Sequence, residues 1–292
     1  MRLCTFQNGH RVGAGLYTES HVYDLGQAFF KTFKRPAKFK DAGDFLSQTA
    51  WDKLGELDLL ALKKDRTVAL ATEDVRLRAP LLRPPKIICV GLNYKAHAAE
   101  QKLEPPKAPL LFAKAANIVI GPGDAIEIPR GVSDQVDYEC ELGVVIGTPG
   151  FRIPRGAAFE HIFGYTIVND VTARDVQRGD KQWFRGKSFS TFCPMGPVIV
   201  SADEFDPAKA AIKLRVNDEL RQDSNTSDLI FNVPFLVEYV SAIFPLEAGD
   251  VISTGTPGGV GMFMTPPRWL KAGDRVDAEI AGIGILNNVG SR

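Results

Sequence analysis

The chain has 292 residues, and its 35 Lys and Arg residues balance 35 Asp and Glu residues. Hydrophobic residues make up 45% of it, which is typical of a globular protein and excludes a disordered chain. Because the net charge is zero, no overall positive field favours nucleic acid or an anionic membrane. No apolar run reaches the roughly 18 residues of a membrane span, and the N-terminus has no apolar segment of secretory length. We therefore expect a cytoplasmic protein with neither nucleic-acid nor membrane partners.

The N-terminal part predicts a small α+β unit. Strand patterns lie at 3–6, 11–16 and 21–23, and helical patterns follow at 27–33 and 44–62. Proline-rich text at 79–85 cannot continue a helix and indicates a boundary. We expect a small N-terminal domain at 1–80 and a larger domain at 81–292.

Short strand patterns broken by glycine and proline turns dominate the chain from residue 87 on. The expected strands are 87–90, 110–113, 126–128, 136–146, 163–169, 197–200, 211–216, 251–253 and 275–280. The expected helices are 93–102, 171–180 and 234–243, with Asp170 or Asn169 as the N-cap of the second. The predicted fold class is α+β and mostly β.

Acidic residues alternate in the segment DYECELGVVIG at 137–147. On a strand, Asp137, Glu139 and Glu141 share one face, and two glutamates about 6.6 Å apart can converge on one cation. Asp170 follows an apolar strand and could join them or cap a helix. Such oxygen ligands favour Mg²⁺, Mn²⁺ or Ca²⁺ over Zn²⁺. The alternative is a solvated acidic strand face.

Several polar residues are candidates to bind a substrate or to activate water beside such a cation. Arg174 and Gln177 share a helix face. Lys187 stands among aromatic residues and is either a snorkelling surface lysine or a ligand for a substrate carboxylate or enolate. His97 and Glu100, three apart on a helix, are either a water-activating dyad or an ordinary surface pair.

A glycine-rich segment, STGTPGGVG at 253–261, could hold an oxyanion through backbone N–H groups or be a mobile turn. It lacks the Gly-Lys-Ser/Thr of a nucleotide-binding loop. It does not open an amphipathic helix, so a dinucleotide-binding fold is not expected.

Taken in order, these segments resemble the fumarylacetoacetate hydrolase family over about residues 85–292. The first 80 residues look like that family's short N-terminal domain, with far weaker motifs. The matching text is GLNYKAHAAE, IGPGDAIEIP, DYECELGVVIG, GYTIVNDVTARDVQ, GKSFSTFCPMGP and STGTPGGVG.

The resemblance implies a β-roll-like barrel of mixed sheets that assembles as a homodimer. It implies Mg²⁺ or Mn²⁺ held by Glu139, Glu141 and Asp170. It assigns Lys187, Arg174, Gln177 and Thr256 to substrate oxygens, and His97 with Glu100 to a dyad on a closing lid. Ser190 departs from the Asp of many relatives, which leaves the substrate class open.

The resemblance further implies a metal-dependent hydrolase that cleaves a C–C bond in small 2,4-dioxo acids through an enolate. His97 and Glu100 would activate water, and Lys187 would stabilise the enolate. An oxaloacetate decarboxylase or a 2-hydroxyhepta-2,4-diene-1,7-dioate isomerase could use the same groups. A protein that binds a divalent metal and a small acid is the non-enzymatic alternative.

Overall fold

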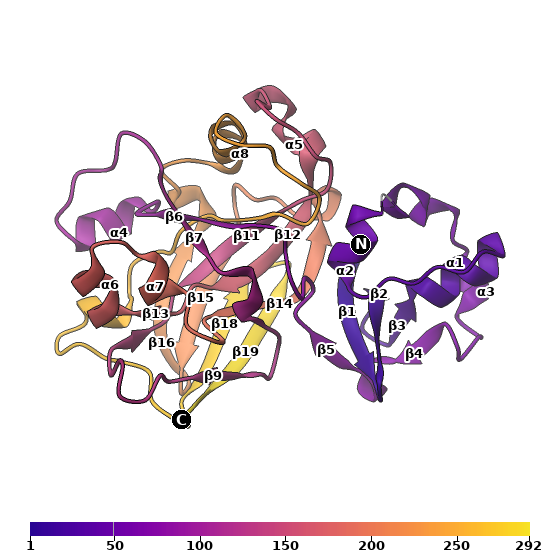
Figure 1. The fold of residues 1–292 in the computed structure, drawn as a ribbon, viewed down its shortest axis with the longest axis horizontal. Coiled ribbons are helices and arrows are strands. Elements are labelled where there is room, and N and C mark those ends of the chain that lie inside the picture. Colours follow the sequence, from indigo (N-terminus) through magenta and orange to yellow (C-terminus); the bar gives the residue numbers. More distant parts are fainter. Residues whose placement is uncertain (49) are drawn as a thin grey trace.

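Mixed β-sheets form most of the computed structural model, which describes residues 1–48 and 50–292 (Figure 1). The largest sheet has 12 strands: β1 (Arg2–Asn8), β2 (Arg11–Tyr17), β3 (His21–Asp24), β4 (Ala69–Ala71), β5 (Arg76–Arg78), β6 (Ile87–Gly91), β7 (Leu110–Lys114), β8 (Val119–Ile120), β11 (Cys140–Ile146), β12 (Ile162–Asn169), β14 (Cys193–Ser201) and β17 (Val251–Ser253). Their order is β4-β3-β2-β1-β14-β12-β11-β17-β6-β7, with β5 paired to β1 and β8 to β14.

A second sheet packs against the middle of the first, on β11, β12 and β14. Its order is β16 (Glu219–Asn225), β15 (Ala211–Val216), β18 (Arg275–Ile280), β19 (Gly284–Ser291) and β9 (Ala125–Glu127). A third, short ladder joins β10 (Val136–Asp137) to β13 (Thr172–Ala173). The two large sheets enclose the apolar core, and the predicted mostly β, α+β class with mixed sheets is confirmed.

Helices cover the edges of these sheets (Figure 1). The α-helices are α1 (Leu25–Phe33), α2 (Ala42–Ser47), α3 (Leu59–Leu62), α4 (Lys95–Glu100), α5 (Ala158–His161), α6 (Arg174–Asp180), α7 (Phe184–Lys187) and α8 (Val233–Ser241). Short 3-10 helices are η1 (Ala50–Glu56), η2 (Thr72–Asp74), η3 (Ala116–Ile118), η4 (Arg155–Ala157), η5 (Ala202–Glu204), η6 (Thr226–Asp228) and η7 (Gly261–Phe263). Within the described residues, no helix combines the length and the apolar character needed to cross a bilayer.

The N-terminal unit forms its own lobe in Figure 1, yet its sheet continues into the larger body. Strand β1 pairs antiparallel with β14, with Leu3 opposite Ile199. The Thr5 hydroxyl also donates to the Pro80 carbonyl at 2.7 Å. The division at residue 80 stays a prediction, and the large sheet crosses it.

Two predicted elements near the acidic residues are wrong in detail. The expected strand 136–146 is interrupted, because the Asp137 carboxylate accepts from Tyr138 N, and the Asn169 side chain accepts from Glu139 N. The expected helix 171–180 begins only at Arg174, since the two preceding residues pair as β13. Asp170 is therefore not an N-cap, and the side chain of the actual cap, Ala173, makes no capping bond.

The expected helix 44–62 is also broken, into α2, η1 and α3. Asp41 caps the N-terminus of α2 and Asp58 that of α3 through side-chain hydrogen bonds, so a new helix begins after each aspartate. Strands β16 and β19 were not predicted, because their polar sequences ELRQDSN and GILNNVGS lack clear apolar alternation.

Strand β12 approaches β14 so closely that it tolerates no side chain at Gly164. A Cβ there would lie 2.1 Å from the Val200 carbonyl oxygen, which is backbone and cannot rotate away. We expect Gly164→Ala to lower the free energy of unfolding by about 3 kcal/mol. Gly156→Ala, where a Cβ would meet open space, is the matched control and should change it by less than about 0.5 kcal/mol. Equal denaturant midpoints for the two variants would contradict this packing.

Candidate active site

Three buried carboxylates meet at the centre of the larger body. Oxygens of Glu139, Glu141 and Asp170 all lie within 4.8 Å of one another. Glu141 lies on β11, Glu139 directly before it, and Asp170 follows the neighbouring strand β12. Because β11 and β12 are antiparallel, the start of one lies beside the end of the other, and Asp170 N donates to the Glu139 carbonyl at 2.8 Å. The structure thus brings together the three predicted metal ligands.

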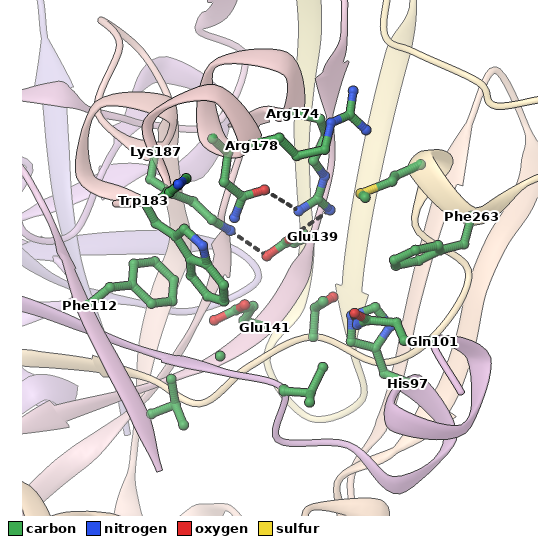
Figure 2. A pocket seen from close by; sticks show the side chains of 17 residues that line it. His97, Gln101, Phe112, Glu139, Glu141, Arg174, Arg178, Trp183, Lys187 and Phe263 are labelled. Carbon is green, nitrogen blue, oxygen red and sulfur yellow. Dashed lines mark hydrogen bonds and ion pairs between the residues drawn. The ribbon is translucent and has the colours of Figure 1, made fainter. Parts of the chain in front are cut away.

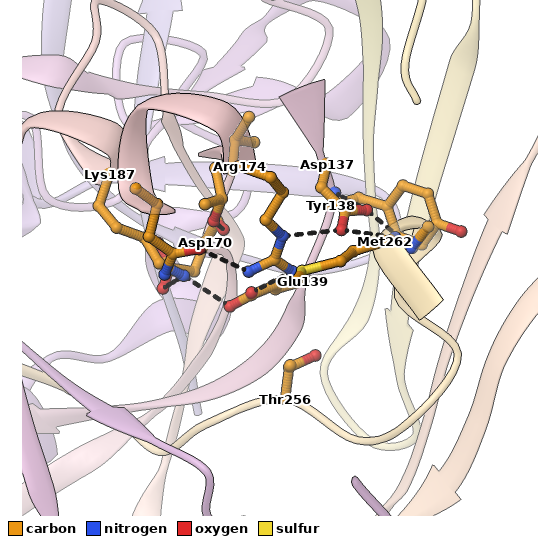
Figure 3. Close-up of polar contacts among 12 residues, drawn as sticks. Asp137, Tyr138, Glu139, Asp170, Arg174, Lys187, Thr256 and Met262 are labelled. Atoms are coloured by element: carbon orange, nitrogen blue, oxygen red, sulfur yellow. Dashed lines mark hydrogen bonds and ion pairs between the residues drawn. The ribbon is translucent and has the colours of Figure 1, made fainter. Parts of the chain in front are cut away.

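Two of the predicted cations bind this cluster directly (Figure 3). The Lys187 ammonium donates to Glu139 Oε2 at 2.8 Å and to Asp170 Oδ2 at 2.6 Å. Arg174 pairs with Glu139 Oε1 at 2.6 Å and with Asp137 Oδ2 at 2.9 Å. Lys187 is only 2% exposed, so the alternative of a snorkelling surface lysine is wrong.

A third cation, Lys114, was missed by the sequence interpretation. It ends β7, and its ammonium donates to Asp170 Oδ1 at 2.5 Å and to the Val171 carbonyl at 3.1 Å. Its side chain is completely buried. A lysine closing the apolar strand LLFAK is the same signal that marked Lys187, and it was available in the sequence.

Asp137 does not join the other acids, although a continuous strand would place it on their face. The break before β11 turns its carboxylate toward Arg174 and toward the N–H groups of Gly261 and Met262, at 2.8 and 3.1 Å. Asp137 therefore holds Arg174 in place from the side away from Glu139.

The cluster holds more negative than positive charge. Its four buried acids are Asp137, Glu139, Glu141 and Asp170, and its three buried bases are Lys114, Arg174 and Lys187. Burial alone would raise the pKa of Glu139, but the Lys187 and Arg174 charges outweigh it and hold that pKa at about 2. Burial and the neighbouring Asp170 and Glu139 charges raise the pKa of Glu141 well above its usual value.

The donor set fits a hard divalent cation. Glu141 has no cationic partner among the described residues, and its Oε2 accepts only from Ser253 Oγ at 2.6 Å and Gly255 N at 3.0 Å. A cation beside it would offset the one excess negative charge of the cluster. Three carboxylates without a nitrogen or sulfur ligand select Mg²⁺, Mn²⁺ or Ca²⁺ rather than Zn²⁺.

The predicted dyad forms on α4, and Figure 2 shows its histidine, His97, beside Gln101 and near the cluster. His97 Nδ1 lies 2.9 Å from Glu100 Oε2, and the Gln101 amide donates to His97 Nε2 at 2.9 Å. In the tautomer that donates from Nδ1 to Glu100, Nε2 is the basic nitrogen and accepts from Gln101. The imidazole is 6% exposed and packs edge-on to Phe263, so it is not an ordinary surface pair.

One cavity of about 270 Å³ connects the dyad to the cluster. It is lined by seven of the nine predicted site residues: His97, Glu139, Glu141, Arg174, Gln177, Lys187 and Thr256. Asp170 and Glu100 hold lining residues from behind. Further lining residues, absent from the prediction, include Phe112, Arg178, Lys181, Trp183 and Phe263.

The glycine-rich segment 253–261 binds the protein's own carboxylates. Gly255 N donates to Glu141, Gly259 N to Glu100 at 3.1 Å, and Gly261 N to Asp137. Gly259 has a φ of +96°, and a Cβ there would lie 2.0 Å from the Arg221 carbonyl oxygen, so only glycine fits. The Thr256 hydroxyl lines the cavity while it donates to the Cys140 carbonyl at 3.1 Å.

A comparison with known proteins assigns the part of the chain that holds this site to a family. Residues 86–289 match the family model described as the fumarylacetoacetate (FAA) hydrolase C-terminal domain. The chain belongs to the fumarylacetoacetate hydrolase family. The family is one of enzymes.

Two curated relatives in the family share a name. An oxaloacetate tautomerase of Bacillus subtilis is 49% identical over 219 residues, which cover 74% of this chain and 73% of the relative. A mitochondrial oxaloacetate tautomerase of Xenopus laevis is 40% identical over 99% of this chain and 89% of its own length.

Solved structures of the family match the whole chain. A fumarylacetoacetate hydrolase from Exiguobacterium antarcticum is 41% identical, with a TM-score of 0.86 and full coverage of both chains. A maleylpyruvate hydrolase from Sphingobium sp. SYK-6, solved with manganese(II) and pyruvate, is 29% identical, with a TM-score of 0.79 over both full chains. A metal ion is therefore present in at least one enzyme of this fold.

Lys114 offers a test of the metal site, because it fixes Oδ1 of Asp170, a predicted metal ligand whose Oδ2 accepts from Lys187. We expect Lys114→Met to weaken Mn²⁺ binding by about 10- to 100-fold, measured by calorimetry. If Lys114 acted only through its positive charge, its loss would strengthen Mn²⁺ binding. The direction of the change in affinity therefore distinguishes a positioning role from an effect of charge. Lys114→Arg keeps the charge and the donors and should bind more tightly than Lys114→Met. Tighter binding by Lys114→Met would contradict the positioning role.

Proposed function

We propose that this enzyme interconverts the keto and enol forms of a small 2-oxo acid of the oxaloacetate type. The observation that carries the proposal is the His97 base, which shares one small cavity with the carboxylate–cation cluster. The two relatives named oxaloacetate tautomerases support it. Keto–enol exchange moves one proton from carbon to oxygen, so it needs a base and enolate stabilisation but no water.

The metal-binding role belongs to Glu139, Glu141 and Asp170, with Mg²⁺ or Mn²⁺ as the ion. When bound, such an ion supplies Lewis-acid polarisation of a 2-oxo group. The donor set and its excess negative charge support this assignment, as does the manganese in the maleylpyruvate hydrolase.

Substrate oxygens are assigned to the cationic side of the cavity. Lys187 carries a positive charge to the place where an enolate oxygen would form. Arg174 donates to Gln177 Oε1 at 3.2 Å. The NH₂ group of Gln177 therefore stays free to donate to a substrate oxygen. Thr256 lies on the same cavity wall and serves a substrate carboxylate.

Proton transfer is assigned to His97. In the tautomer with its ring proton on Nδ1, Nε2 is the basic nitrogen, and the Gln101 amide that donates to it must first move away. Nε2 then accepts the proton from C3 of the keto acid and delivers it to the 2-oxo oxygen to give the enol, and the reverse transfers restore the keto acid. Glu100 stabilises the imidazolium that forms, and Gly259 N–H in turn fixes Glu100 at 3.1 Å. Phe263 and Phe112 limit access of water to the base and to Lys187.

Hydrolysis of a C–C bond in a 2,4-dioxo acid is the second candidate. The same dyad favours it, because Nε2 could deprotonate a water molecule as readily as a carbon acid. The maleylpyruvate hydrolase of the same fold supports it. Decarboxylation of oxaloacetate, or isomerisation of a hydroxydienoate, would use the same metal and cations with less demand on the dyad.

Replacement of His97 tests the proposed role of the base. We expect His97→Asn to slow ketonisation of enol-oxaloacetate by about 10²-fold or more, followed by the ultraviolet absorbance of the enol with Mg²⁺ present. Oxalate binding should persist, since the metal ligands and Lys187 remain. Glu141→Gln is the matched control that should lose metal and oxalate binding together.

Product analysis separates the candidates. The tautomerase proposal expects wild-type enzyme to consume enol-oxaloacetate without releasing pyruvate. Faster pyruvate release from an acylpyruvate than enol exchange would favour hydrolysis, and pyruvate from oxaloacetate would favour decarboxylation. Ketonisation by His97→Asn within a factor of a few of wild type would remove the histidine from the mechanism.

A further inference from the structure

Helix α6 and its C-cap residue, Lys181, present a row of basic and amide side chains to the cavity. Arg174, Gln177, Arg178 and Lys181 all line it. Arg174 and Gln177 are buried against the cluster, whereas Arg178 and Lys181 are exposed. Figure 2 shows Arg174 and Arg178 on the same side of the cavity. A helix rises 1.5 Å per residue, so the row extends roughly 10 Å from the buried end to the exposed end. Arg178 and Lys181 therefore mark the mouth of the cavity.

The acids of α6 do not neutralise this mouth. Asp175 accepts from the Ser133 hydroxyl at 2.6 Å, and Asp180 binds Arg185 through both of its oxygens. Arg178 donates to the uncharged Gln135 side chain. Among the residues that the structure describes, neither Arg178 nor Lys181 forms an ion pair with a carboxylate.

The acids inside the cavity do not neutralise it either. Glu139 is already paired with Arg174 and Lys187, and Glu141 is buried among the Ser253 and Gly255 donors. Two unpaired cations in a chain without net charge thus face the path into the cavity. Such an arrangement attracts and orients an anionic group at that point.

From this geometry we infer a second anion subsite, made by Arg178 and Lys181, that selects 2-oxo dicarboxylic acids over monocarboxylic ones. The inference rests on the proposed function, in which the first carboxylate and the 2-oxo group lie at the buried cluster. The distal carboxylate of the substrate then extends toward the mouth, where it meets Arg178 and Lys181. Both are specificity-determining residues and take no part in the proton transfer.

The alternative is a substrate with an apolar distal group, which would pack on the aromatic side chains that line the cavity. Phe112 and Trp183 pack against each other at 5.1 Å and line the same cavity, and Phe263 closes it near His97. These side chains would favour an acyl chain. The unpaired charges favour the dianion, because a distal carboxylate at the mouth can bind both cations, whereas an alkyl tail gains nothing from them.

Oxaloacetate and its 4-methyl ester form the test pair, because they differ mainly in the distal charge. We expect wild-type enzyme to prefer oxaloacetate by about tenfold or more in kcat/KM, mostly through KM. The preference should fall with rising salt. In the double variant Arg178→Gln/Lys181→Met the ratio should fall toward one. The control Arg152→Gln/Lys209→Met removes two exposed positive charges outside the cavity and should keep the wild-type ratio.

Displacement of bound oxalate, followed by calorimetry with Mg²⁺, keeps this test separate from turnover. Oxalate is too short to reach the mouth, so its binding by the double variant shows that the inner site is intact. If the enzyme binds oxalate normally but shows no turnover, the tautomerase proposal is rejected. Displacement of oxalate by oxaloacetate and by its 4-methyl ester would still measure the preference for the diacid. The second subsite is overturned if wild-type enzyme binds both compounds equally, or if the double variant retains the wild-type preference.

Discussion

The excess of buried negative charge is the constraint on which this structure depends. Four carboxylates lie in the core beside three cations, and each unpaired buried charge costs several kcal/mol. The fold meets that cost with short donors to nearly every carboxylate oxygen, from lysines on two elements and from backbone N–H groups. One negative charge is left over, and it lies beside three carboxylates that could hold a cation. The capacity to bind a metal thus follows from how the charges of the core are paired.

One loop connects the separate parts of the site. The segment 253–261 donates N–H groups to Glu141 in the cluster, to Glu100 in the dyad, and to Asp137, which holds Arg174. It can come this close because Gly259 and Gly261 have no side chain, and a Cβ at either would collide with backbone oxygen. The distance between the His97–Glu100 dyad and the carboxylate cluster is therefore controlled by one backbone segment that bonds to both.

Local patterns predicted much of the site but not its boundaries. The alternation of Glu139 and Glu141 survives, since these residues enter a buried strand. Asp137 was predicted on the same face. The strand is broken after it, because the side chains of Asp137 and Asn169 accept hydrogen bonds from the next two backbone N–H groups. The place of Lys114 at the end of an apolar segment was visible in the sequence, but its partner, Asp170, lies 56 residues away and is brought near only by the β6-β7 edge of the sheet. No local pattern carries that pairing.

The sequence by itself determined the strand-rich fold class, the acidic triad, the His97–Glu100 spacing and the family resemblance, because strand alternation and helical spacing act over a few residues. Tertiary structure alone decided which oxygen each cation takes, where Asp137 points, and which charges stay unpaired. Those outcomes depend on contacts such as Lys187 with Glu139, across 48 residues, and Gly255 with Glu141, across 114. Electrostatic pairing is settled by distance in space, and the order of residues along a chain specifies it only through the fold.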